Sequence, residues 1–139
     1  MKFVALIARV LLGAAFVFFG LNGLHPFMKM PPPPPGLAGE FSHALFASGY
    51  VKVVALLQVI GGLLCLIGRF VPLGLTLLGP VIVNILLFHI FLNPSGAAPG
   101  VIVAVLALIV LWDERTAFAP LLRAKKPSVP DGQVEQKAP

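Results

Sequence analysis

The chain has 139 residues, of which 58% are hydrophobic and only 11% are charged. An average soluble domain is roughly 45–50% apolar and about 25% charged, so this composition excludes a water-soluble globule. The formal net charge is +5. Because most basic residues flank apolar runs, orientation in a bilayer explains this charge more simply than nucleic-acid binding does.

Four apolar runs are predicted to cross a membrane as helices. They cover residues 3–24, 50–68, 72–92 and 99–118. The fourth run is purely apolar only to Trp112 and is extended to Phe118 because the hydrocarbon core is roughly 30 Å thick. The length of the runs favours helices, since a barrel strand needs only about 10 residues. We therefore expect an all-α integral membrane bundle of four transmembrane helices within residues 1–122.

The first run has an alternative interpretation as a secretory signal peptide, because Lys2 precedes an apolar stretch. Arg9 interrupts that stretch, and no small-residue cleavage site follows Phe19. Three further apolar runs also follow, which favours a membrane span.

Two segments after the first run are predicted to lie outside the hydrocarbon. Residues 31–35 are all proline and should form a stiff polyproline II spacer; an SH3-domain ligand looks similar, but the side of the membrane assigned below argues against it. Residues 37–48 place apolar side chains at four-residue spacing opposite Glu40 and His43, which predicts a short extracytoplasmic helix lying in the interface. Residues 123–139 are predicted to be a disordered basic tail.

The distribution of basic residues predicts the orientation. Four spans place both chain ends and the turn near Arg69 on one side of the membrane. The basic residues of that side are Lys2, Arg69, Arg115, Arg123, Lys125 and Lys126. The other side has only Lys29 and Lys52. The positive-inside rule therefore predicts that both termini and the tail are cytoplasmic.

Arg9 is predicted to lie roughly 10 Å inside the first span. The small residues on its helix face are Gly13, Gly20 and Gly23, a stripe of the kind that packs against another helix. Arg9 either reaches back to the cytoplasmic headgroups or pairs with Asp113 or Glu114, which the fourth span would carry to a similar depth.

Gln58 and Asn84 are predicted to lie at matching depths of roughly 12 Å in the second and third spans. Two interpretations stay open. The amides could form interhelical hydrogen bonds, worth about 0.6 kcal/mol on average. Alternatively, they could contact a quinone or another small molecule in a cavity that Asn22 and His89 also line.

Other chemistry has weaker support in the sequence. His25, His43 and His89 should lie near the outer face, and Glu40 and His43 have the spacing of half a di-iron site. The second Glu-x-x-His motif that such a site needs is missing, so no metal site is predicted.

Cys65 is the only cysteine, which excludes an internal disulfide. No phosphate loop, nucleophile elbow or HExxH motif is present, which argues against a self-contained hydrolase or nucleotide enzyme.

Several motifs together resemble the DoxX-like family. They are Arg9-x-x-x-Gly13, Phe19-Gly20-Leu21-Asn22-Gly23, Gly61-Gly62-Leu63-Leu64, Arg69-Phe70-Val71-Pro72-Leu73, the run from Pro80 to His89, and Phe118-x-Pro120-Leu121-Leu122. The resemblance covers about residues 3–122 and implies a compact four-helix bundle in a bacterial cytoplasmic membrane. Relatives look like the small subunits of thiosulfate:quinone oxidoreductase. Where relatives commonly carry a glutamate, this chain has Gln58, which cannot act as a general base.

We therefore expect an accessory membrane subunit, without activity of its own, associated with a quinone-linked oxidoreductase. The alternative is a small-molecule or quinone-binding carrier whose cavity is lined by Gln58, Asn84 and His89. An independent redox enzyme has the least support, because the chain has no second thiol and no nucleotide-binding motif. The expected partners are the lipid bilayer and an oxidoreductase rather than nucleic acid, and homo-oligomerisation stays open.

Overall fold

A computed structural model describes residues 1–125 and 128, and all regular structure in this part of the chain is helical. The elements are α1 (Lys2–Leu24), α2 (Leu37–Ala47), α3 (Tyr50–Ile67), α4 (Val71–Phe91), η1 (Pro94–Gly96), α5 (Ala98–Asp113), α6 (Arg115–Phe118) and η2 (Ala119–Leu122). The predicted all-α class is confirmed for these residues. Most of the predicted tail, 123–139, lies outside them.

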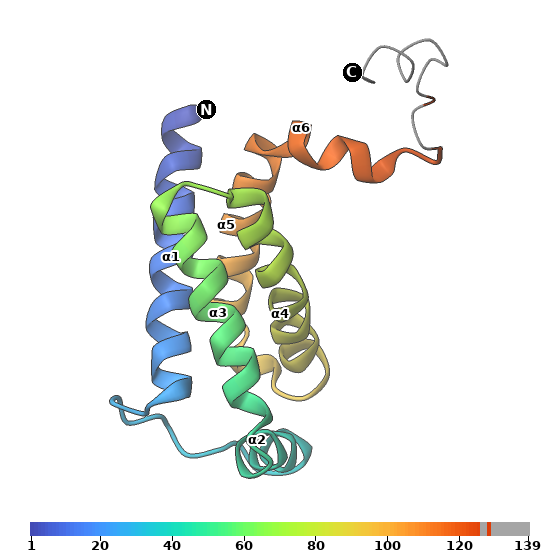
Figure 1. Ribbon diagram of the computed structural model, residues 1–139. Helices are drawn as coiled ribbons and strands as arrows, with labels where there is room; N and C mark the ends of the chain where they lie inside the picture. The colour runs from blue at the N-terminus through green and yellow to red at the C-terminus, as the bar shows by residue number, and fades with distance from the viewer. Residues whose placement is uncertain (126–127, 129–139) are drawn as a thin grey trace, which may run out of the picture.

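Four helices form the bundle, and each packs against two others. α1 contacts α3 and α5, and α4 contacts the same two helices. Successive bundle helices run in opposite directions (Figure 1). The N-terminus, the turn from α3 to α4 and α6 therefore lie at one end of the bundle, and α2 and the turn from α4 to α5 lie at the other.

The outer surface of the bundle is apolar, as expected for a protein surrounded by lipid. Val53, Ile60 and Ile67 follow one side of α3, and their exposed fractions are 61%, 41% and 65%. A soluble monomer rarely exposes a continuous apolar surface of this kind. α1, α3 and α4 are long and apolar enough to cross a membrane. The chain is therefore a helical membrane protein.

The fourth apolar run differs from its predicted extent. Helix α5 ends at Asp113, and Glu114 forms a turn with φ −89° and ψ 9°. The predicted continuation of this span to Phe118 is wrong. Two interactions at the turn explain the end: the Arg115 guanidinium donates a hydrogen bond of 2.7 Å to the Trp112 carbonyl oxygen and lies 5.1 Å from the centre of the Trp112 ring. Phe118 then packs against the core, and α6 leaves the bundle axis (Figure 1).

Glycines bring the helices of the bundle into close contact. A Cβ atom on Gly13 would lie 2.7 Å from the Gly62 carbonyl oxygen, and one on Gly62 would lie 2.8 Å from that of Gly13. Gly61 and Gly74 make an equivalent contact between α3 and α4. Small residues at such positions allow backbones to approach, which is how helices associate in lipid. The predicted packing stripe on α1 therefore faces α3.

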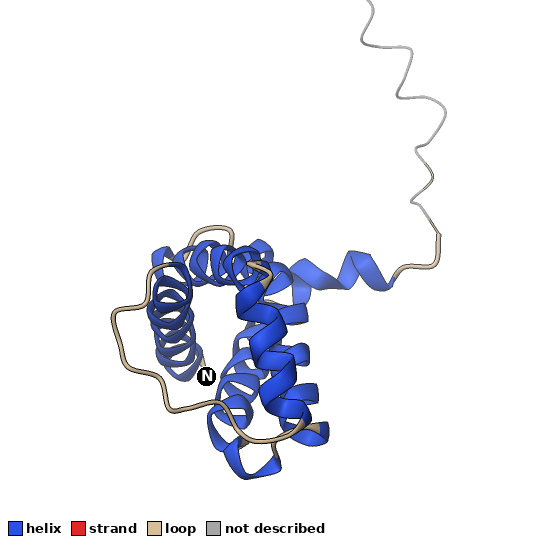
Figure 2. Cartoon of the chain, turned by 90° about the horizontal axis from the view of Figure 1, so that it is seen from below, coloured by secondary structure: helices blue, strands red, loops and turns tan. Residues whose placement is uncertain are grey.

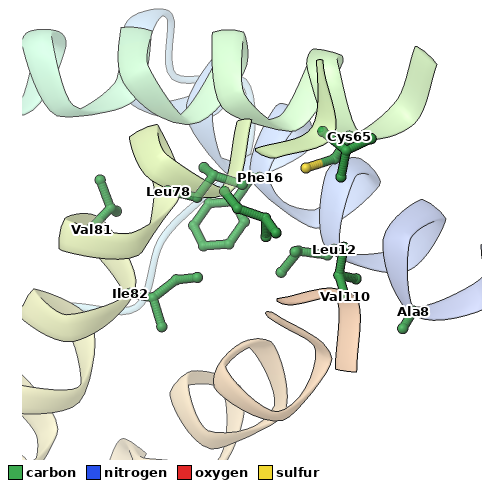
Figure 3. Close-up of a cluster of buried hydrophobic side chains, with 10 residues drawn as sticks. Ala8, Leu12, Phe16, Cys65, Leu78, Val81, Ile82 and Val110 are labelled. Atoms are coloured by element: carbon green, nitrogen blue, oxygen red, sulfur yellow. The ribbon is translucent and has the colours of Figure 1, made fainter. Parts of the chain in front are cut away.

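The packed core lies mainly toward the end of the bundle that holds the N-terminus and the turn from α3 to α4. Its fully buried residues include Leu12 of α1, Cys65 of α3, Leu78 of α4 and, 2% exposed, Val110 of α5. Figure 3 shows Leu12, Phe16, Leu78 and Val110 converging from three helices. The opposite half of the bundle is hollow, as described below.

Helix α2 covers part of the hollow end of the bundle. It lies across the bundle axis and is seen end-on in Figure 1, and the long connection from α1 runs around the outside of the bundle to reach it (Figure 2). Ala38 of α2 is buried, and the ring of Phe41 lies 5.6 Å from that of Phe88 on α4. The helix predicted at residues 37–48 is thus present, and it is fixed to the bundle by an aromatic contact.

Candidate functional site

A cavity of about 390 Å³ lies in the hollow half of the bundle, between α1, α2, α3 and α4. The polar residues in its wall are Asn22, Ser42, Gln58, Asn84 and His89, and the wall also includes Phe19, Phe41, Phe46 and Phe88. The structure thus brings together Gln58, Asn84, His89 and Asn22, the residues that the sequence analysis proposed to line one cavity. They come from three helices, and they meet because the antiparallel arrangement places the end of α1 and the second half of α4 beside the first half of α3.

Two of these polar side chains, Asn22 and Ser42, already form hydrogen bonds within the protein. The Oδ1 atom of Asn22 accepts hydrogen bonds from the backbone N–H groups of Phe27 at 3.1 Å and Met28 at 3.0 Å. Ser42 donates from its hydroxyl to the Ala38 carbonyl oxygen at 2.9 Å. Asn22 therefore fixes the start of the connection after α1, and Ser42 is bonded within its own helix.

His89 is held by the turn that follows α4. Its Nδ1 atom lies 3.1 Å from the carbonyl oxygen of Asn93, and its ring meets that of Phe88 edge to face at 5.2 Å. Gly96 and Gly100 leave room for the imidazole, because a Cβ atom on either glycine would lie 3.3 Å or 3.2 Å from a ring carbon. The orientation of the imidazole is thus determined by its surroundings.

Gln58 and Asn84 have no hydrogen-bonding partner within the part of the chain that the structure describes. No residue there that is half-buried or buried has a buried side-chain polar atom without a partner, so the amide of half-buried Gln58 is accessible, and Asn84 is itself exposed. Direct interhelical hydrogen bonding between the two amides, one of the two interpretations of the sequence, is therefore not seen in residues 1–125.

Asn84 lies at the more open side of the cavity. It is exposed and also lines a second hollow of about 450 Å³ between α2, α3 and α4, together with Tyr50, Leu57 and Pro80. Thr76, one turn before Pro80 in α4, lines neither hollow. Its hydroxyl donates to the Pro72 carbonyl oxygen at 2.8 Å, so this residue is satisfied within its own helix.

Arg9 interacts with α3 rather than with the acids at the end of α5. Its guanidinium lies against Gly68, the C-cap residue of α3. Helix carbonyls accumulate partial negative charge at a C-terminus, which favours a cation there. No ion pair joins Arg9 to Asp113 or Glu114 among residues 1–125. The pairing with an acid, one of the two alternatives for Arg9, is absent there, and the guanidinium lies instead against the C-terminal end of α3.

Cys65 is a packing residue in the core. Its side chain is fully buried, and its Sγ atom would lie 3.1 Å from a Cβ atom on Gly74. Figure 3 shows it among apolar side chains. In the described residues, no group of three or more His, Cys, Asp or Glu side chains is placed to hold a metal ion.

The aromatic wall of the cavity was not anticipated from the sequence. Phe41 was expected on the apolar face of an interfacial helix, and its contact with Phe88 makes α2 part of the cavity wall.

Comparison of the chain with protein-family models, curated proteins and solved structures gives no match. The DoxX-like resemblance therefore stays a prediction.

Proposed function

We propose that this chain is a membrane protein that binds a small lipophilic molecule in the cavity beneath α2. The observation that supports this proposal is the presence of two unpartnered amides, Gln58 and Asn84, in a largely apolar cavity. A polar group without a hydrogen-bonding partner is costly in an apolar environment, and polar side chains inside membranes commonly mark functional sites. A ligand, or water in its absence, would satisfy both amides.

The size and lining of the cavity indicate the class of ligand. Small-molecule sites span roughly 300–1,000 Å³ and combine apolar walls with a few polar groups that orient the ligand. Aromatic side chains line this cavity, and the amides can each donate and accept hydrogen bonds. A ring compound with polar substituents, such as a quinone or quinol, meets these conditions. The proposed activity is therefore the binding or transport of this ligand and not its chemical conversion.

The accessory role beside a quinone-linked oxidoreductase in a bacterial cytoplasmic membrane rests on the DoxX-like resemblance. Purification from native membranes with bound neighbours, followed by mass spectrometry, tests it. A co-purifying flavoprotein or dehydrogenase would support the role. A chain that purifies alone, or only with copies of itself, would argue against it.

We further propose that all four bundle helices cross the membrane, with both termini cytoplasmic. Helix α5 rises roughly 24 Å over its length, short of a core of roughly 30 Å, and local thinning of the bilayer offsets such a mismatch at modest cost. The turn from α3 to α4, which contains Arg69, and helix α6, which begins at Arg115, lie at the same end of the bundle as the N-terminus (Figure 1), and the positive-inside rule assigns this end to the cytoplasm. The cavity then opens in the outer half of the membrane.

Labelling of single cysteines tests this orientation. In a Cys65→Ala background, an impermeant thiol reagent added to intact cells should label Pro33→Cys and leave Lys125→Cys unlabelled until the cells are opened. Labelling of Lys125→Cys alone from outside would invert the orientation, and labelling of both would mean an odd number of crossings.

Filling the cavity tests the binding function. Ser42→Phe places a ring inside the cavity from α2, whereas Ala47→Phe adds the same ring to an exposed position on the same helix that lines neither hollow. The wild-type protein and Ala47→Phe should purify with a stoichiometric small molecule detectable by mass spectrometry, and Ser42→Phe should not. A wild-type protein without such a molecule, or equal retention by both variants, would refute the proposal.

A further inference from the structure

Residues 115–125, named the basic segment below, extend sideways from the bundle. They contain α6 and η2 and follow the turn at Glu114. Figure 1 shows the segment crossing the direction of the bundle helices, and Figure 2, seen from below, shows it projecting away from them. Because lipid surrounds the bundle, the basic segment lies along the membrane surface at the end that holds the N-terminus.

The side chains of the basic segment match a membrane surface. All of them are exposed except that of Phe118, which is half-buried. Leu121 and Leu122 are 76% and 88% exposed, and lipid would cover both. The charged residues of the segment are all basic: Arg115, Arg123 and Lys125. Apolar and basic side chains exposed together are typical of segments that bind the interface of an anionic membrane.

An apolar groove between α4 and α5 adjoins the basic segment. Its volume is about 290 Å³, and its wall includes Phe118 of the segment. Val83 and Leu108 in the wall are 55% and 63% exposed, so the groove opens toward lipid. Gly79 keeps it open, since a Cβ atom there would have no atom within 4 Å. None of the residues in its wall lines the cavity beneath α2.

Two cations of the basic segment are available to a ligand. The Arg115 guanidinium is bonded to the Trp112 carbonyl oxygen and lies against its ring. Arg123 and Lys125 are exposed and follow Phe118 in the chain. The segment therefore combines a side chain that borders an apolar groove with cations that can bind an anion.

We propose that an anionic phospholipid binds here, with one acyl chain in the groove between α4 and α5 and its phosphate against Arg123 and Lys125. Guanidinium and ammonium groups form strong hydrogen bonds to phosphate oxygens. Two copies of this chain joined symmetrically along the groove would bring two basic segments together, so charge favours a phospholipid over a second copy. Under the orientation proposed above, the lipid belongs to the cytoplasmic leaflet, which is rich in anionic lipid.

Retention of two matched lipids tests the headgroup contact. The full chain is reconstituted in vesicles of equal parts phosphatidylglycerol and phosphatidylcholine with identical acyl chains and released into detergent, and native mass spectrometry counts the retained lipids. A basic residue near an anionic headgroup favours binding about fivefold, so two should give the wild-type protein a preference for phosphatidylglycerol of about 25-fold.

The preference should depend on the cations of the basic segment alone. Arg123→Gln combined with Lys125→Gln changes only exposed side chains and should retain the two lipids equally. Lys29→Gln combined with Lys52→Gln is the matched control, because it removes two exposed cations at the other end of the bundle. This control should keep the preference of the wild-type protein.

Filling the groove tests the position of the acyl chain. Gly79→Phe places a ring in the open space of the groove and should lose most of the retained phosphatidylglycerol. Leu73→Phe is the control, because Leu73 is 52% exposed on the same helix and does not line the groove. Thermal unfolding is measured for both variants, and Gly79→Leu replaces Gly79→Phe if the larger side chain destabilises the bundle.

The outcomes decide the proposal independently of the cavity beneath α2. Equal retention of the two lipids by the wild-type protein, or an unchanged preference in the variant without Arg123 and Lys125, would overturn the headgroup contact. Full retention by Gly79→Phe would overturn the position of the acyl chain, and a wild-type dimer that Gly79→Phe dissociates would assign the groove to a second copy. Ser42→Phe, which fills the cavity beneath α2, should retain phosphatidylglycerol as the wild-type protein does.

Discussion

Replacing Gly62 with alanine should lower the free energy of unfolding of the bundle by about 2 kcal/mol, a typical cost of overpacking a core. The new Cβ atom would lie 2.8 Å from the carbonyl oxygen of Gly13 and 3.0 Å from the backbone nitrogen of Val17. Backbone atoms cannot rotate away as a side chain can, so α1 and α3 would have to separate. Unfolding of the purified protein in mixed micelles, measured by circular dichroism, provides the comparison.

Gly79→Ala is the matched control for this change. Gly79 lies inside α4, and a Cβ atom there would have no atom within 4 Å. Because alanine is favoured over glycine in a helix by up to about 1 kcal/mol, this variant should unfold at the same free energy as the wild-type protein or slightly above it. An unchanged free energy of unfolding in Gly62→Ala, or an equal loss in Gly79→Ala, would show that the close contact between α1 and α3 at Gly62 does not control the stability of the bundle.

Replacing Gln58 with leucine should weaken binding of a ring compound such as 2-naphthol about tenfold without destabilising the bundle. The side chain is half-buried, and its amide has no protein partner in the described residues, so its removal breaks no internal hydrogen bond. A leucine of similar size adds apolar contacts in the same place. The lost affinity corresponds to one polar contact with the ligand, about 1.4 kcal/mol. Equilibrium binding in nanodiscs and unfolding in micelles measure the two effects separately.

Leu56→Ala serves as the control for Gln58→Leu, because Leu56 is 50% exposed on the same helix and lines neither hollow beneath α2. Its affinity for 2-naphthol should equal that of the wild-type protein. A marked loss of stability in Gln58→Leu, with unchanged affinity, would show instead that Gln58 joins the helices through a bonded water and that the cavity wall is purely structural.

The sequence by itself determined the class of the protein and the position of most helices. The apolar runs at residues 3–24, 50–68 and 72–92 match α1, α3 and α4 to within one residue at each end. This part of the fold is predictable because hydropathy is a local property, and because every backbone polar group in lipid has to bond within its own helix. The glycine stripe on α1 was predictable for the same reason, since helical periodicity fixes which residues share a face.

Local contacts that hydropathy does not report decided where α5 ends, and tertiary structure decided which group Arg9 meets and how the cavity is closed. The length of a membrane core predicted a helix to Phe118, but the hydrogen bond and ring contact between Arg115 and Trp112 favour a turn at Glu114. Arg9 contacts the C-terminal end of α3 because the close approach of α1 and α3 at Gly13 and Gly62 brings that end within its reach. Contacts between residues far apart in the chain, such as Phe41 with Phe88, leave no periodic signal. They depend on how the helices pack, and packing here is decided by small residues and shape rather than by hydropathy.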